Sequence, residues 1–233
     1  MKLFTTKKFK TFVVSSLMCF TLAPSIVSAH SYVGGIASIS DVTSAQSAIY
    51  TPATYPTINT SPSGSQFSSS WVMVSEQYSS TPGDLFQVGW AHEPEISYVT
   101  YPLYFVASIV NGHYSEVRAQ VGPAKGSTHT YKAYISGSNW VGMVDNTSIG
   151  TLPVSGVSPD TVQYCAEISD DPMYTPFIGT NSDRMKFSSV RYTKSGSSTL
   201  LKPSLGWVNQ TGSGLYKDDY DSSGYFTTWN ASY

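Results

Sequence analysis

A glutamine, a glutamate and a tryptophan occupy comparable positions in three segments that have the pattern of β-strands. Side chains of a strand point alternately to opposite faces of the sheet. In the segment Leu85–Trp90 (LFQVGW), three large apolar side chains, Phe86, Val88 and Trp90, therefore share one face. Gln87 lies on the opposite face, behind what this pattern predicts to be the core.

The same alternation places Trp71 and Glu167. In SSSWVMV (68–74) the two valines share one face, and Trp71 shares the other with a methionine. In TVQYCAEIS (161–169) an apolar stripe faces one way, whereas Glu167 and Cys165 face the other. We therefore predict that three strands present an indole, an amide and a carboxylate to one outer face of a bent sheet. There, Gln87 and Glu167 should lie close enough to contact one shared water molecule or to hydrogen-bond directly.

This combination of side chains suits acyl transfer. A carboxylate can act as a general base on a water molecule. A fixed amide N–H can stabilise the negative charge that develops on a carbonyl oxygen, typically by about 3–4 kcal/mol. An indole ring offers a flat apolar wall. These roles fall to Glu167, Gln87 and Trp71 respectively.

The order and wording of these segments resemble the glutamic peptidases, both the eqolisins and the neprosin group. The resemblance covers about two thirds of the chain after residue 29, in short pieces: YVGGIAS (32–38), AIYTPATYP (48–56), SSWVMVSE (69–76), LFQVGW (85–90) and VQYCAEISD (162–170). It implies a sandwich of two bent antiparallel sheets and metal-independent, cofactor-free hydrolysis of polypeptides at acidic pH. It also implies that Gln87 is the catalytic amide, Glu167 the catalytic acid/base and Trp71 a substrate-binding wall.

The sequence also departs from these families. The aromatic segment that follows in eqolisins is YPLYFVAS (101–108) here, and the segment after the first tryptophan has become VMVSEQ. In neprosins a glutamate holds the position of Gln87. These departures keep open a second function, a non-catalytic binding module for carbohydrate or a cell surface. Aromatic platforms built on residues such as Trp71 and Trp140 would distinguish that module from an enzyme.

Less specific explanations exist for each candidate. Gln87 can be a solvent-facing strand residue, and Glu167, followed by Asp170 and Asp171, can be a solvated strand end. Trp71 can be core if its strand is buried on both faces. Cys165 is expected to be a small buried hydrophobe; a Cys–His nucleophile pair with His92, His113 or His129 is the alternative. The segment KDDYDSSG (217–224) loosely resembles a calcium loop but lacks the bidentate glutamate of that motif, so we expect a solvated loop and no metal.

The rest of the chain indicates an exported all-β protein. A lysine-rich start, an apolar segment and small residues at 27–29 predict a signal peptide over residues 1–29. After it, nine Lys and Arg stand against fifteen Asp and Glu, which argues against a nucleic-acid partner. We expect an extracellular monomer without a membrane span. Since Cys19 lies in the leader, no intrachain disulfide can form.

Short alternating segments between turn-rich breaks predict a jelly-roll-like β-sandwich. We expect one domain over residues 30–233, in which residues 203–233 form a last strand and a loose end. The expected strands are Tyr32–Ile39, Ala48–Thr51, Ser69–Glu76, Asp84–His92, Tyr101–Val110, Ser115–Val121, His129–Ser136, Trp140–Asp145, Thr161–Ser169 and Arg184–Tyr192.

Overall fold

The structure is a computed structural model that describes residues 31–53, 67–76, 83–93, 101–153, 156–168, 179–210, 215–218 and 220–230. The predicted signal peptide and most of the loop expected between 51 and 68 lie outside these residues. Within them every regular element is a β-strand. No helix long and apolar enough to cross a membrane occurs in the described part of the chain.

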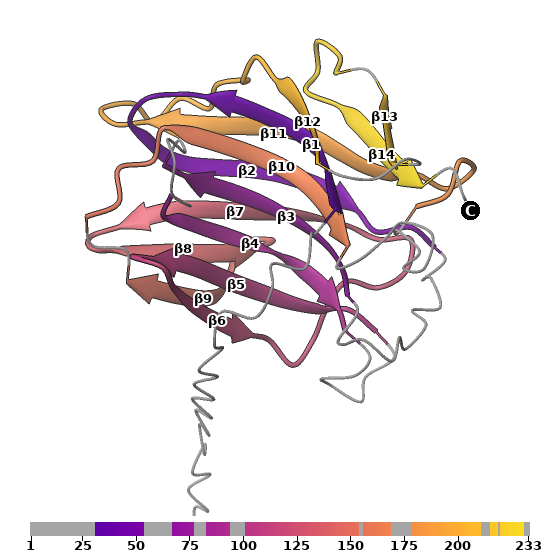
Figure 1. Cartoon of the computed structure of the whole chain (residues 1–233), viewed down its shortest axis with the longest axis horizontal. Helices are drawn as coiled ribbons and strands as arrows, with labels where there is room; N and C mark the ends of the chain where they lie inside the picture. The colour runs from indigo at the N-terminus through magenta and orange to yellow at the C-terminus, as the bar shows by residue number, and fades with distance from the viewer. Residues whose placement is uncertain are drawn as a thin grey trace, which may run out of the picture.

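The strands form two seven-stranded antiparallel sheets that pack face to face (Figure 1). Sheet A has the order β12 (Gly206–Gln210), β1 (Ser31–Ser38), β10 (Thr161–Ile168), β3 (Ser68–Ser75), β4 (Leu85–His92), β5 (Leu103–Val110), β6 (His113–Arg118). Sheet B has the order β13 (Leu215–Asp218), β14 (Phe226–Asn230), β11 (Met185–Lys194), β2 (Val42–Tyr50), β7 (Thr128–Ser136), β8 (Asn139–Val144), β9 (Thr147–Pro153). The predicted all-β sandwich is confirmed.

The apolar stripes meet between the two sheets. All six side chains predicted to be core are buried there, namely Phe86, Val88, Trp90, Val162, Tyr164 and Ile168. From sheet B, Trp140 stacks on Phe86 with ring centroids 5.9 Å apart. Alternation within the strands therefore fixes which side chains are left for the outer faces.

Three expectations about strand extent are wrong. β2 begins at Val42, six residues before the predicted start. A strand absent from the prediction, β9, follows β8 through a two-residue turn in which Asp145 and Asn146 both have positive φ. This conformation, favoured by Asp and Asn, matches the twist of a tight hairpin. The C-terminal part contains β12, β13 and β14 instead of one strand and a loose end.

Candidate functional site

Strand β3 is buried on both of its faces, and this decides the character of the outer face of sheet A. All eight residues of β3 are buried. Trp71 and Met73 belong to a second apolar cluster on the outer face, together with Phe105, Ala107 and Cys165. Trp71 is only 4% exposed. A ligand resting on the outside of the sheet would therefore find very little of this indole ring to contact.

The structure brings Trp71 and Glu167 together. The indole N–H of Trp71 donates a hydrogen bond of 2.8 Å to Oε2 of Glu167. Ser69, directly opposite Glu167 on β3, lies with its hydroxyl 3.5 Å from the same oxygen. On the other side, β1 places Tyr32 opposite Glu167. The carboxylate is thus held by its neighbours in a fixed orientation on a half-buried site.

Gln87 shares this outer face but does not reach Glu167. On β3 the partner of Gln87 is Met73, whereas the partner of Glu167 is Ser69. Four residues of β3 separate these partners, which corresponds to about 13 Å along the strands, and two strand spacings add about 10 Å across them. The expectation that both side chains share one water molecule is therefore wrong. The strand register separates them, although each lies on the predicted face.

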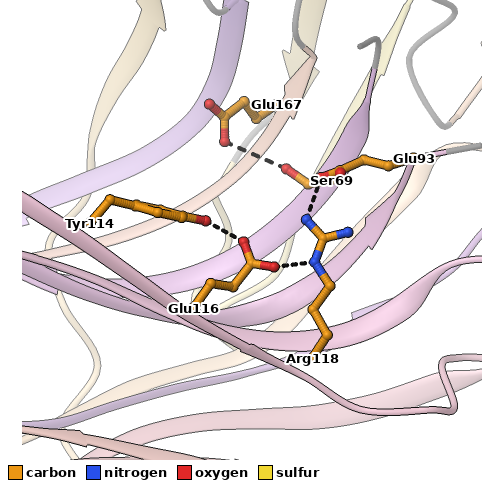
Figure 2. A network of polar contacts seen from close by, with 6 residues as sticks. All are labelled: Ser69, Glu93, Tyr114, Glu116, Arg118 and Glu167. Atoms are coloured by element: carbon orange, nitrogen blue, oxygen red, sulfur yellow. Dashed lines mark hydrogen bonds and ion pairs between the residues drawn. The ribbon is translucent and has the colours of Figure 1, made fainter. Parts of the chain in front are cut away.

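A second set of polar contacts, which sequence reasoning missed, lies on the same face as Glu167 (Figure 2). Arg118 on β6 donates a hydrogen bond of 2.8 Å to Glu93, which follows β4. It also donates to Glu116, and Glu116 accepts a further bond from the hydroxyl of Tyr114. We call these residues, with the Glu167 pair, the carboxylate network: Ser69, Trp71, Glu93, Tyr114, Glu116, Arg118 and Glu167.

The carboxylate network is partly shielded from water and carries excess negative charge. The side chains of Arg118, Glu93 and Glu116 are 24%, 11% and 17% exposed. Burial raises the pKa of Glu93 above its usual range; the hydrogen bond from Arg118 offsets this only in part, and the charges of Glu116 and Glu167 raise it further. Burial alone would lower the pKa of Arg118, but its bonds to Glu116 and Glu93 raise it. Glu93 and Glu116 therefore share one guanidinium, and the charge of Glu167 acts on Glu93 from a distance.

One sequence signal could have revealed part of this network. Strand β6 reads HYSEVR, so Tyr114, Glu116 and Arg118 alternate onto one face by the rule applied above to Gln87. That this face is the one carrying Glu167 follows only from pairing across β3, β4 and β5. The sequence of one strand carries no information about such a pairing.

The alternatives to this site also have outcomes. Cys165 is buried, as expected for a small hydrophobe; burial first, and Glu167 second, raise the pKa of its thiol, which makes it a poor nucleophile. Trp140 lies in the core between the sheets, so with Trp71 it cannot form an exposed aromatic platform. In the described part of the chain no three His, Cys, Asp or Glu side chains are placed to hold a metal ion. In the loop expected at 217–224, Asp221 accepts hydrogen bonds from Ser223 and Tyr225.

Comparison with known proteins gives likenesses of fold alone. No protein-family model and no curated protein matches the chain. Among solved structures, a carbohydrate-binding module, CBM66 from Bacillus subtilis, is 14% identical with a TM-score of 0.37, over 60% of this chain and 77% of that one. CG-16, an agglutinin from chicken liver, is 10% identical with a TM-score of 0.39, over 68% and 98%. A family 16 endo-glucanase from Bacteroides ovatus is 12% identical with a TM-score of 0.36, over 59% and 66%. At such values these neighbours assign no function.

Proposed function

We propose that this protein is a binding module and that the carboxylate network on the outer face of sheet A recognises a carbohydrate. The observation that carries the proposal is the set of charged side chains on this face. Glu93, Glu116 and Arg118 are joined by hydrogen bonds and Glu167 is held by Trp71, whereas the register keeps Gln87 from reaching Glu167. A site of fixed polar groups beside an apolar cluster is typical of small-molecule recognition.

Carbohydrate suits these groups because its hydroxyls both donate and accept hydrogen bonds. Carboxylates accept such bonds in pairs, and a guanidinium donates them from a rigid fork. Mutual pairing holds the side chains in place before a ligand arrives, which lowers the entropic cost of binding. Tyr114, 56% exposed beside Glu116, supplies an accessible ring for the apolar face of a sugar. Trp71 would act by positioning Glu167.

Binding of a panel of soluble glycans, measured by calorimetry, tests the proposal. We expect Glu167→Gln to weaken binding by about tenfold or more, because a hydrogen bond to a charged group contributes about 1.5–3 kcal/mol. Lys132→Gln serves as the control, since it removes one charge from the other sheet, and it should leave affinity for neutral glycans within about twofold. Folded wild-type protein that binds no glycan would refute the proposal, as would undiminished binding by Glu167→Gln.

The second candidate is the acid endopeptidase that the resemblance to glutamic peptidases implies. The raised pKa of Glu93 beside Glu167 favours it, because an acid–base pair needs two carboxyls of different proton affinity. Hydrolysis of denatured protein over pH 3–7, with and without a chelator, tests it. If Gln87 is the oxyanion donor, Gln87→Ala should lower turnover roughly a hundredfold; if Glu93 is the partner of Glu167, Glu93→Gln should do so instead. No hydrolysis by the wild type removes the candidate.

Under either function we propose that the protein acts outside the cell. The support is the lysine-rich, apolar start of the chain with small residues before His30. N-terminal sequencing of protein recovered from the culture medium should show a chain that begins near His30. A chain retained in the cell with its first residues intact would contradict this.

A further inference from the structure

The outer face of sheet B carries a set of cations that lie over aromatic rings. The guanidinium of Arg184 lies 3.6 Å from the centre of the Trp229 ring. The ammonium of Lys186 lies 4.7 Å from the centre of the Tyr50 ring, and that of Lys132 lies 5.1 Å from the centre of the Tyr134 ring. We call these six residues the cation–aromatic face.

Five of the six residues belong to one face of four neighbouring strands, and Arg184 directly precedes one of these strands, β11. Lys186 lies between the buried residues Met185 and Phe187, so it points away from the core, and its partner on β2 is Tyr50. The same alternation on β7 places Lys132 outside, between the buried Tyr131 and Ala133. Strands β14, β11, β2 and β7 are adjacent in sheet B, so the face crosses about 14 Å of sheet at the usual strand spacing.

The two lysines of this face have no carboxylate partner in the described part of the chain. Acidic residues outnumber basic ones by fifteen to nine after residue 29, so ion pairing would be easy. Yet among the described residues neither Lys186 nor Lys132 forms a salt bridge. Asp183, beside Tyr50, accepts hydrogen bonds from the Tyr50 hydroxyl and the Ala53 N–H. A cation over a ring keeps its N–H donors available to an anion.

A hollow at the β11–β14 side of the face holds an unused hydroxyl. It is lined by Arg184, Lys186 and Thr227, with Asn181, Ser182, Tyr225 and Asp221 around them. Thr227 is 5% exposed, and its hydroxyl has no hydrogen-bond partner among the described residues, although a buried polar group ordinarily has one. Asp221 adds a negative charge, but one of its oxygens is taken by Ser223 and Tyr225. The hollow is thus lined by two cations, of which Arg184 also donates hydrogen bonds to the carbonyl and side-chain oxygens of Asn181 and Lys186 forms no salt bridge.

We propose that the cation–aromatic face binds an extended anionic polysaccharide whose sugars carry carboxylate or sulfate groups. Cations repeated across adjacent strands match charges repeated along a polymer, and the aromatic rings under them hold these cations in place. Ser188 and Thr130 are both register partners of Ala48, and the exposed Thr130 adds a hydroxyl to the same face. This proposal does not depend on the function proposed above, because it concerns the other sheet.

Binding of the whole protein to polygalacturonate and to dextran sulfate tests the inference. We expect binding that weakens as salt increases. The double variant Lys132→Gln with Lys186→Gln should bind about tenfold more weakly, because each exposed ionic contact contributes up to about 1 kcal/mol. The double variant Lys125→Gln with Lys194→Gln removes the same charge from a loop and from the opposite end of β11, and should stay within about twofold. Thermal unfolding checks that both variants fold.

Four outcomes would overturn the inference. The first is no binding by the wild type, and the second is undiminished binding by the double variant of Lys132 and Lys186. The third is an equal loss of binding in both double variants, which would show that binding depends on net charge alone. The fourth is binding to vesicles of anionic phospholipid without binding to either polymer. Neutral dextran is the control for sugar without charge, and should bind at least tenfold more weakly than its sulfated form.

Discussion

The two outer faces of this sandwich hold their charged groups in opposite ways. On sheet A, Glu93, Glu116 and Arg118 are partly buried beside a second apolar cluster and pair with one another. On sheet B, Lys186 and Lys132 lie over rings without a carboxylate partner among the described residues. A charge that loses water needs a partner, whereas a solvated one does not. Side chains on sheet A should therefore contribute to stability, and those on sheet B mainly to surface charge.

The largest expected effect is that of Arg118→Gln. It removes the guanidinium that donates to Glu93 and Glu116, so these two carboxylates are left partly buried and mutually repelling. Breaking a fully buried pair costs about 3–5 kcal/mol, and partial exposure should reduce this to about 2–3 kcal/mol. Urea unfolding measures it, with Lys132→Gln on sheet B as the control. Equal effects of the two substitutions would refute the contrast between the faces.

A smaller effect should come from the bond between Trp71 and Glu167. Trp71→Phe keeps an aromatic ring but removes the N–H that donates to the carboxylate. A double-mutant cycle with Glu167→Gln should show a coupling energy of about 1–2 kcal/mol, as for a partly exposed hydrogen bond to a charged group. Strictly additive effects on the free energy of unfolding would show that the bond does not hold Glu167.

Glu93 should make stability depend on pH. Because burial raises its pKa, the folded chain binds this proton more tightly than the unfolded chain. Its stabilising contribution is therefore complete below the ordinary glutamate pKa of about 4.3, and is lost as the pH rises through the higher pKa of the folded state. Glu93→Gln removes this titration, so the variant should gain stability relative to wild type between pH 4 and pH 7. A constant difference across that range would contradict the assignment.

The smallest expected effect is that of Lys186→Gln. Its ammonium is exposed and lies over the ring of Tyr50, so the free energy of unfolding should change by less than about 0.5 kcal/mol. Chemical denaturation of this variant beside Arg118→Gln gives the widest contrast that the two faces allow. A loss above about 1 kcal/mol would mean that the face is part of the folded framework and not a solvated surface.

The fold was predictable wherever alternation is strong. Phe86, Val88 and Trp90 repeat every second residue, and their burial follows from that period alone. Strand β9 (TSIGTLP) alternates only weakly between apolar and polar residues, so its own sequence did not identify it. The signal for this strand lies in the turn residues Asp145 and Asn146, which precede it. The strands after residue 203 are four or five residues long, and the segments between them contain glycines and aspartates. No alternation of apolar and polar residues could therefore be established there.

The site was predictable as a face but not as a constellation. Alternation placed Gln87, Trp71 and Glu167 on one side of sheet A, and the register agrees. Which of them meet depends on how far each strand slides past its neighbour, and hydrogen-bonded backbones permit many such offsets. The register that pairs these strands places Trp71 beside Glu167 and keeps Gln87 distant from Glu167. It also places Arg118 at the same level along the strands as Trp71.

The position of β1 has a consequence for the order of folding. Its two neighbours in sheet A are β10 and β12, so the first strand of the sandwich pairs only with segments that follow it by more than a hundred residues. Until residue 161 and those beyond it have been synthesised, both edges of β1 lack their partners. Closing such distant pairs is slow, and an unpaired strand invites association with other chains. The earliest strand to be made is thus among the last to be protected, and a chain truncated before β10 should aggregate.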